Sequence, residues 1–384
     1  MKIFLVAAEE SGDRLGAALM QALRAKRPQV SFAGVGGSDM AAAGLQSLFA
    51  VHDLSIVGLA AIPRRLPMIF RRIRQTADAV LDAKPDVLVI IDSPDFTHRV
   101  ARRVRRADPS IPIVDYVSPS VWAWRPGRAR KMRAYVDHLL ALLPFEPDVH
   151  RRLGGPPCTY VGHPLVEQAQ YLRPDPDEAR RRMASPAILL VLPGSRGSEL
   201  RRLQAIFAQA TQLLAQRAGP FEIVIPSVPH LAPAIAAHAG AWPVPPRIVT
   251  DPREKQAAFR TARAALAKSG TVTLELAVAG VPMAAAYRLS SVEAMIARQV
   301  IRVSTAILAN LVLGENVVPE FLQRDCQPEQ LATALAPLLS DSPARRRQIE
   351  AFARLDGLMQ IGTARPAQRA ADIVIGVAER RPVD

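Results

Sequence analysis

The chain has 384 residues, 49% hydrophobic and 22% charged, a composition typical of globular proteins and a length that suggests two or three domains. Lys and Arg outnumber Asp and Glu by 49 to 35, and this surplus favours anionic partners: phosphorylated ligands, nucleic acid or an acidic membrane surface. The two cysteines, Cys158 and Cys326, lack the spacing of a zinc site or a disulfide framework, so we expect two buried thiols. Prolines interrupt the longest uncharged stretch, residues 223–246, and no segment is predicted to cross a membrane.

Short apolar runs alternate with amphipathic segments, which predicts an α/β protein with parallel sheets. In the first half the expected strands lie at residues 3–8, 31–35, 87–91, 111–117 and 136–143. In the second half they lie at residues 187–192, 221–225, 247–250, 264–266 and 282–287. Residues 165–186, which hold Pro174, Pro176 and many charges, are predicted to link two domains. The pattern predicts two Rossmann-like halves with a ligand in the cleft that they face.

Two carboxylates, Asp92 and Asp95, follow the buried run at 87–91. Open α/β sheets bind ligands at the carboxyl ends of their strands, so this position predicts an active site. The turn after the first strand brings Glu9 and Ser11 to the same sheet edge if the strands are parallel. A second interpretation is that the polar residues of each turn only cap the helix that follows.

Residues 54–74 interleave apolar side chains with five arginines. This pattern is typical of a surface that lies on a membrane, where apolar groups enter the headgroup boundary and arginines meet lipid phosphate. An amphipathic helix packed on the core explains the same pattern, so the residues alone leave both interpretations open.

A Ser- and Pro-framed loop from Ser118 carries Trp122 and Trp124 beside several basic residues. This combination predicts a binding loop for a ligand with a ring face and a phosphate, although one tryptophan of the pair can equally belong to the core.

Small residues and an arginine follow the first strand of the second half, at residues 193–199. Free helix amides and a guanidinium converge in such a turn, which predicts an anion site with phosphate as its guest. A second small-residue turn spans residues 268–275, where Glu275 either accepts from both hydroxyls of a ribose or completes a capping box. One acidic site, two phosphate turns and no cluster of metal ligands together indicate a nucleotide-sugar transferase.

Seven motifs match one family in order and spacing: A-A-E-E-S-G-D, I-D-S-P-D-F, Y-V-S-P-S-V-W-A-W-R, L-P-F-E, V-G-H-P, L-P-G-S-R-G-S-E and S-G-T-V-T-L-E. From the first strand to about Cys326 the chain resembles the lipid-A-disaccharide synthases. The resemblance implies a GT-B fold and an inverting glycosyltransferase that uses neither a metal nor a cofactor. Such enzymes transfer 2,3-diacylglucosamine from its UDP derivative to 2,3-diacylglucosamine 1-phosphate, giving the β-1,6-linked lipid A disaccharide 1-phosphate and UDP.

The resemblance also implies roles for the residues that match its motifs. The catalytic positions are Asp92, as the base for the acceptor 6-hydroxyl, with Glu9, Ser11 and Asn310. The UDP-sugar positions are Ser195, Arg196, Ser269, Gly270, Thr271 and Glu275. The acceptor or phosphate loop holds Ser118, Trp122, Trp124 and Arg125. The membrane-contacting positions are Ile62, Leu66, Ile69 and Phe70.

The family resemblance further implies an acceptor-binding and catalytic domain at 1–165 and a UDP-sugar-binding domain at 187–345. Helices at 346–384 are expected to return to the first domain, and the protein to associate peripherally with the cytoplasmic face of an anionic inner membrane. The resemblance also suggests a homodimer, which no pattern in the sequence indicates. The chain departs from the family at Ala8, Glu10 and Ala309, which affects local geometry more than reaction class.

Two other functions stay open. A UDP-sugar epimerase or hydrolase shares the two-domain plan and the donor turns, but it has no need of an apolar, Arg-edged surface. A basic nucleic-acid-binding protein would explain the net charge of +14. Aromatic residues make up only 5% of the chain, and its arginines are scattered over many helices, so no nucleic-acid partner is expected.

Overall fold

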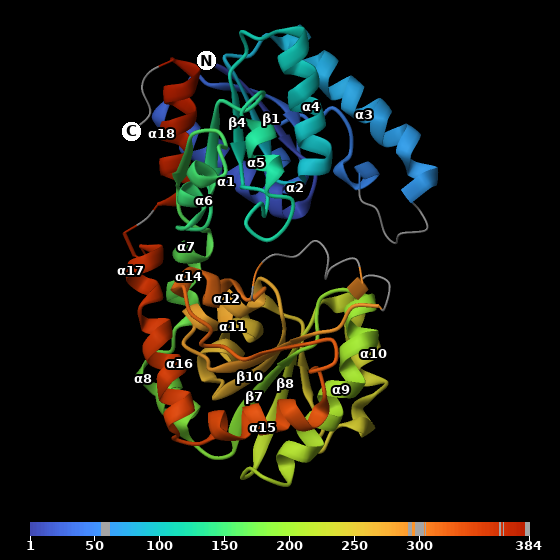
Figure 1. Ribbon diagram of the computed structural model, residues 1–384, viewed down its shortest axis with the longest axis vertical. Helices are drawn as coiled ribbons and strands as arrows, with labels where there is room; N and C mark the ends of the chain where they lie inside the picture. Colours follow the sequence, from blue (N-terminus) through green and yellow to red (C-terminus); the bar gives the residue numbers. More distant parts are fainter. Residues whose placement is uncertain are drawn as a thin grey trace. The chain divides into compact units, whose positions relative to one another are not determined.

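The computed structural model describes residues 1–54, 62–290, 294–295, 303, 305–360, 362–363 and 365–380, without the side chains of residues 52, 53 and 62–65. The chain divides into two compact units, unit 1 (Met1–Pro164 and Thr363–Asp384) and unit 2 (Leu165–Gly362). Each unit holds a six-stranded sheet with helices packed against it (Figure 1). No helix among the described residues combines the length and the apolar character needed to cross a membrane.

Unit 1 is built on a sheet in which all neighbouring strands are parallel. Its strands are β1 (Lys2–Ala7), β2 (Ser31–Val35), β3 (Val87–Ile91), β4 (Ile113–Tyr116), β5 (His138–Ala141) and β6 (Cys158–Tyr160). Its helices are α1 (Glu10–Lys26), α2 (Ser38–Ala42), η1 (Val51–Leu54), α3 (Ile62–Ala83), α4 (Pro94–Ala107), α5 (Gly127–Met132), α6 (Glu146–Arg152) and α18 (Pro366–Ala378). The strand order β2-β1-β3-β4-β5-β6 changes direction between β1 and β3, and at such a switch point α/β sheets bind ligands.

After the exposed Lys2, strand β1 is buried on both faces, which is why residues 3–7 are uniformly apolar. On one face Ile3 and Leu5 pack with α1 and α18. On the other face Phe4 and Val6 pack with α3 and α4. The last helix, red in Figure 1, therefore completes a core that the first strand begins.

Unit 2 repeats the parallel plan. Its strands are β7 (Ala187–Leu192), β8 (Phe221–Pro226), β9 (Arg247–Val249), β10 (Ala264–Lys268), β11 (Met283–Tyr287) and β12 (Glu320–Leu322). Its helices are α7 (Leu165–Leu172), α8 (Pro176–Met183), α9 (Gly197–Ala215), η3 (Pro229–Leu231), α10 (Ala232–Ala236), η4 (Ala239–Ala241), α11 (Pro252–Thr261), α12 (Val272–Val278), α14 (Leu308–Leu313), α15 (Pro328–Leu339), α16 (Pro343–Ala353) and α17 (Leu355–Met359). The order β12-β11-β10-β7-β8-β9 places the switch point between β7 and β10.

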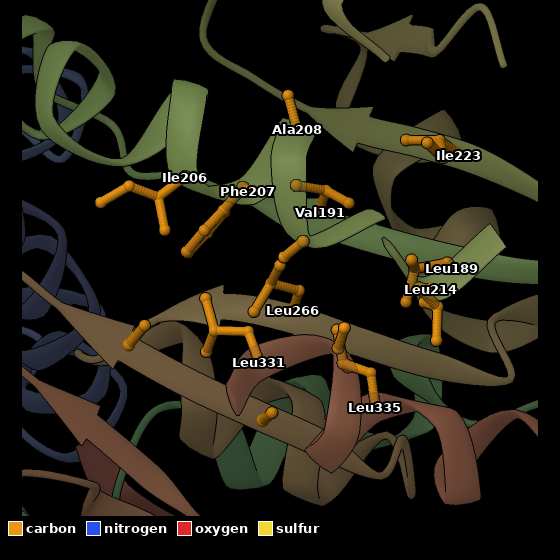
Figure 2. Close-up of a cluster of buried hydrophobic side chains, with 14 of the residues drawn as sticks. Leu189, Val191, Ile206, Phe207, Ala208, Leu214, Ile223, Leu266, Leu331 and Leu335 are labelled. Atoms are coloured by element: carbon orange, nitrogen blue, oxygen red, sulfur yellow. The ribbon is translucent and has the colours of Figure 1, made fainter. Parts of the chain in front are cut away.

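The core of unit 2 lies between its sheet and the helices α9 and α15. Figure 2 shows Phe207 of α9 and Leu331 of α15 directed toward Val191 and Leu266 of the sheet. Burial of these large apolar groups fixes the sheet, and with it the turns that follow β7 and β10.

The expected linker at 165–186 differs from the structure, where it forms α7 and α8 within unit 2. Asp175 accepts a hydrogen bond from the Glu178 amide at 2.8 Å, and Glu178 accepts from the Asp175 amide at 3.2 Å. With Pro176 at the first helical position, this capping box makes the charged, Pro-rich stretch a helix start.

The expected domain boundary at 346 also differs. Helices α16 and α17 belong to unit 2, and the chain joins unit 1 only from Thr363. The short strand β12 lies beyond the sequence prediction too, because three residues carry too little periodicity to be recognised.

Candidate active site

Asp92 stands in a strained turn directly after β3. Both Asp92 and Ser93 have positive φ, 53° and 46°, a conformation that costs of order 1–3 kcal/mol for each non-glycine residue. The Asp92 amide donates to the Tyr116 carbonyl at 3.0 Å, and Thr97 Oγ1 donates to the Asp92 carbonyl at 2.7 Å. These neighbours hold the turn in place, and backbone strain of this kind is concentrated at functional sites.

The turn after β1 meets this aspartate. Ser11 Oγ donates to Asp92 Oδ2 at 3.0 Å, while the Ser93 amide donates to Asp92 Oδ1 at 2.7 Å, so both carboxylate oxygens are oriented. The approach depends on Gly12, where a Cβ atom would lie 3.2 Å from the Ile91 carbonyl oxygen. The structure thus brings Ser11 and Asp92 together at the switch point of unit 1.

Glu9 belongs to the same turn and is exposed, as the residue that precedes α1. Within the described chain neither Glu9 nor Ser93, the N-cap residues of α1 and α4, makes a side-chain capping hydrogen bond. The capping interpretation therefore fails at both turns. Asp13, within α1, caps a different helix, because it accepts from the amides of Gly37 and Met40 at the start of α2.

A buried polar network lies behind Asp92. His98 Nε2 is 3.0 Å from Asp115 Oδ2, and His98 Nδ1 is 3.0 Å from the Tyr135 hydroxyl. Burial raises the pKa of Asp115, and Asp92 raises it further by repulsion. No sequence pattern predicts this network, because His98 of α4, Asp115 of β4 and Tyr135 of the segment after α5 meet only in the fold.

The tryptophan loop is anchored at one end and exposed at the other. Trp122 Nε1 donates to Glu146 Oε1 at 3.2 Å, and the Ser118 hydroxyl lies 2.9 Å from His150 Nε2. Trp124 is exposed, with the guanidinium of Arg125 over its ring at 4.4 Å. Trp122 is thus the structural member of the pair, while Trp124 and Arg125 offer a ring face and a cation to a ligand.

Burial raises the pKa of Glu146 to about 7, and the amide of Leu143 and the indole of Trp122 oppose this by donating to the carboxylate. Burial lowers the pKa of His150 to about 4. At neutral pH the His150 ring is therefore uncharged, while the Glu146 carboxyl group is close to its pKa.

Only part of the expected membrane patch faces outward. On α3 the side chains of Leu66 and Phe70 are exposed, at 41% and 51% of their surface. Ile69 is half-buried and packs against the core of unit 1, so it is less exposed than Leu66 or Phe70. The helical period places all three on one side of α3, because residues 66, 69 and 70 have the i, i+3 and i+4 spacings of a helix face, so their exposure differs within one apolar stripe. The Ile62 side chain lies outside the described residues.

The donor residues surround a pocket of about 350 Å³ at the switch point of unit 2. Its lining includes the expected Ser195, Arg196, Gly270, Thr271 and Glu275. Ser269 is buried beneath it, and its hydroxyl donates to Glu320 Oε1 of β12 at 2.6 Å. Five of the six expected donor positions thus line one cavity, and the sixth supports its floor.

Three further charged residues line the same pocket: Glu199, Lys255 and Lys268. Lys268 Nζ lies 3.2 Å from Glu199 Oε1, and Lys255 Nζ lies 3.0 Å from Glu275 Oε2. The sequence signal for Lys268 was its place at the carboxyl end of a strand, immediately before the small-residue turn. Lys255 follows no recognisable motif, and only the packing of α11 brings it here.

Asn310 is placed differently from its expected catalytic role. It is buried in unit 2, where its Oδ1 accepts from the amides of Val317 and Val318. Its Nδ2 donates to the Val318 carbonyl at 2.9 Å and to Thr305 Oγ1 at 3.4 Å. These four bonds use the full capacity of the amide, so the Asn310 side chain holds its own loop in shape.

Comparison with known proteins now decides the family. A family model described as "Lipid-A-disaccharide synthetase" matches residues 3–374. A lipid-A-disaccharide synthase from Nitrobacter hamburgensis is 63% identical over 375 residues, which cover 97% of this chain and 95% of the relative. One from Rhodospirillum centenum is 46% identical and covers 99% of this chain and 96% of the relative.

The chain belongs to the lipid-A-disaccharide synthase family. Membership in the lipid-A-disaccharide synthases makes it a glycosyltransferase and confirms the reaction class expected from the motifs.

Solved structures agree on the fold. MurG from Acinetobacter baumannii is 16% identical, with a TM-score of 0.58, covering 97% of this chain and 99% of that one. The UDP co-structure of S. aureus MnaA is 12% identical, with a TM-score of 0.65, covering 100% of this chain and 99% of that one. A Listeria monocytogenes protein described as a UDP-N-acetylglucosamine 2-epimerase has a TM-score of 0.65 at 13% identity, covering 99% and 97%. The expected α/β fold with two Rossmann-like halves of the GT-B kind is confirmed.

Proposed function

We propose that this protein transfers 2,3-diacylglucosamine from UDP-2,3-diacylglucosamine to 2,3-diacylglucosamine 1-phosphate. The products are the β-1,6-linked lipid A disaccharide 1-phosphate and UDP. The observation that carries the proposal is that family membership spans nearly the whole chain, while each unit has a polar site of suitable chemistry at its own switch point. Unit 1 offers a carboxylate, and unit 2 offers a cation-lined pocket.

Asp92 acts as the general base in this proposal. It takes the proton from the acceptor 6-hydroxyl as that oxygen attacks the anomeric carbon from the side opposite UDP, which inverts the configuration. Its support is the geometry of the carboxylate, which Ser11 and the Ser93 amide hold in one orientation. Glu9, exposed on the same turn, adds negative charge beside the acceptor.

The pocket of unit 2 binds the UDP portion of the donor. Glu275 accepts from the ribose hydroxyls, and Arg196 with the turn at Ser269 to Thr271 meets the diphosphate. The pocket volume and charged lining support this assignment, as does the presence of UDP in the S. aureus MnaA structure of the same fold.

Trp124 and Arg125 serve the acceptor, since their exposed ring and cation suit a sugar phosphate. Leu66 and Phe70 contact the anionic cytoplasmic face of the inner membrane, where both lipid substrates reside. The Arg99 guanidinium, 5.4 Å from the Phe70 ring centroid, supports this by placing a cation beside the apolar groups at headgroup depth.

The deciding experiment measures UDP release from UDP-2,3-diacylglucosamine, with and without 2,3-diacylglucosamine 1-phosphate, in the presence of EDTA. We expect release only with acceptor and undiminished by EDTA. The structural likeness to UDP-N-acetylglucosamine 2-epimerases makes epimerisation the second candidate. Release without acceptor, or epimerised donor and no disaccharide, would establish that candidate instead.

The Asp92→Asn variant tests the base within the same assay. We expect transfer to fall by about 10³-fold, because general-base catalysis is lost while the shape of the side chain is kept. Calorimetric UDP affinity should stay within twofold of the unmodified protein. The matched control is Asp95→Asn, which removes an exposed carboxylate three residues along the same turn and should lower transfer less than tenfold. Equal losses in both variants would rule out Asp92 as the base.

A further inference from the structure

Lys268 is held in the donor pocket by a buried carboxylate. It is the last residue of β10, and its ammonium lies 3.2 Å from Glu199 Oε1 and 5.1 Å from the centroid of the Tyr287 ring. Glu199 is only 5% exposed, and its other oxygen accepts from the Ser195 amide at 3.1 Å. The carboxylate is therefore fixed, and it fixes the ammonium in turn.

Two glycines make room for this pair. Gly194 has a φ of +124°, and a Cβ atom there would lie 2.4 Å from Glu199 Oε2. A Cβ atom at Gly270 would lie 2.9 Å from Lys268 Nζ. Because Gly194 and Gly270 have no side chains, the Glu199 and Lys268 side chains can pack closely against the two turns. This packing keeps the Lys268 ammonium in the lining of the cavity.

The pocket carries a surplus of positive charge. Glu199 Oε1 is shared, since Arg196 Nη1 lies 3.7 Å from the same oxygen that Lys268 contacts. The remaining charged pair of the described lining is Lys255 with Glu275. Three cations therefore face two carboxylates, and the surplus lies at the Arg196 and Lys268 end.

We infer that Lys268 is a catalytic residue that donates a hydrogen bond to the diphosphate of the nucleotide sugar and stabilises the charge that develops on departing UDP, with Glu199 as its positioning residue. The inference rests on the proposed function and adds a residue to it. An ammonium held in place before the reaction needs no reorganisation when the charge forms, which is the condition for effective electrostatic stabilisation.

The chemical step balances without a change at Lys268. The acceptor 6-oxygen forms a bond to the anomeric carbon, and its proton passes to Asp92. The bond between the anomeric carbon and the diphosphate oxygen breaks, and its electron pair stays on that oxygen as UDP. Lys268 keeps its proton throughout and offers it as a hydrogen bond to this diphosphate.

The experiment compares Lys268→Met with the unmodified protein in two assays. Calorimetry measures affinity for UDP and for UMP, which requires neither acceptor nor turnover. We expect UDP to bind about tenfold more weakly, as for loss of one hydrogen bond to a charged group, and UMP to change less than twofold. Transfer kinetics should show kcat lowered about 100-fold with a smaller rise in KM. Lys268→Arg should recover kcat to within about tenfold.

Two further variants make the result decisive. Arg347→Met removes an exposed charge from α16 of the same unit and should leave both affinities and kcat unchanged. Lys268→Met combined with Glu199→Gln leaves no unpaired carboxylate if the single variant is poorly folded, and the same loss of UDP affinity over UMP affinity is expected. Equal weakening of UDP and UMP, or unchanged UDP affinity in a folded variant, overturns the role of Lys268. Selective UDP weakening in a protein that transfers nothing would retain Lys268 as a diphosphate ligand and reject the proposed reaction.

Discussion

At the scale of single residues, polar side chains differ in how much hydrogen-bonding capacity remains available for a substrate. Asp92 has a strained backbone and an oriented carboxylate, whereas the side-chain amide of Asn310 makes all its hydrogen bonds within its own loop. Asp92 belongs to the I-D-S-P-D-F motif, whereas Asn310 lies outside the seven motifs and follows Ala309, where the chain departs from the family. Hydrogen-bond accounting therefore separates a residue that can act on substrate from one that shapes the site.

The buried Glu146 provides a test at the scale of single residues, because its pKa makes the unfolding free energy depend on pH. Its pKa in the folded state, raised by burial to about 7 from 4.5, exceeds that of the unfolded chain. The folded state therefore keeps a proton that the unfolded state releases between these values, and the unfolding free energy falls by about 3 kcal/mol as pH rises from 4.5 to 7. Glu146→Gln lacks this contribution, so its stability relative to the unmodified protein should increase with pH across this window.

The measurement is urea denaturation at several pH values, followed by the fluorescence of Trp122 and Trp124 with Trp242→Phe in every protein. The pKa of His150 is lowered by burial to about 4, so this residue makes the unfolding free energy rise with pH. Taking the difference between Glu146→Gln and the unmodified protein removes this contribution, because both contain His150. Asp148→Asn, on an exposed site of the same helix, should give a flat difference. A flat difference for Glu146→Gln would contradict the burial of its charge.

At the scale of elements, α3 shows how one helix serves two surroundings. Ile69 and Ile73 pack against the core of unit 1. Leu66 and Phe70 are exposed, and Arg99 of α4 lies over the Phe70 ring. These four residues follow the i, i+3, i+4 and i+7 spacing of one apolar stripe, so the two interpretations of the Arg-rich segment apply to different residues of the same stripe.

Leu66→Ser combined with Phe70→Ser tests the exposed apolar residues of α3. Removing two exposed apolar groups, each contributing about 1.5–3 kcal/mol when fully buried, should lower the partitioning onto anionic vesicles at least tenfold. Flotation with vesicles that contain acidic phospholipid measures this. The matched control, Ile349→Ser with Leu358→Ser, removes two comparably exposed apolar groups from α16 and α17. Equal flotation of the two double variants would exclude a membrane role for α3.

At the scale of the whole molecule, the C-terminal helix α18 completes the core of unit 1, to which the N-terminal strand β1 also belongs. Ala371 and Val374 of α18 are fully buried against α1 and β1, although more than 300 residues of sequence separate them from that strand. Among the described residues, all those that line the donor pocket belong, by contrast, to unit 2. The stability of unit 1 and the affinity of unit 2 for UDP should therefore respond to different mutations.

Val374→Ala tests the contribution of α18 to the core of unit 1. Loss of two buried methyl groups should lower the unfolding free energy of unit 1 by about 2 kcal/mol, measured by urea denaturation with the same tryptophan probes. Asp372→Ala, which removes an exposed ion pair with Lys26, should change it by less than about 1 kcal/mol. UDP affinity should stay the same in both. A similar cost for the two variants would mean that α18 lies on unit 1 without being part of its core.

The sequence by itself determined the βα alternation, the main buried strands and the turns that carry Asp92, Ser11 and Arg196. Local patterns suffice for these, because an apolar run followed by polar residues shows both a strand and the edge at which it ends. The tertiary structure alone decided that Ile69 packs against the core and that the amide of Asn310 is fully hydrogen-bonded. It also decided that Lys255 and Lys268 meet in one pocket. Each of these depends on which distant segments pack together, and no local pattern carries that information.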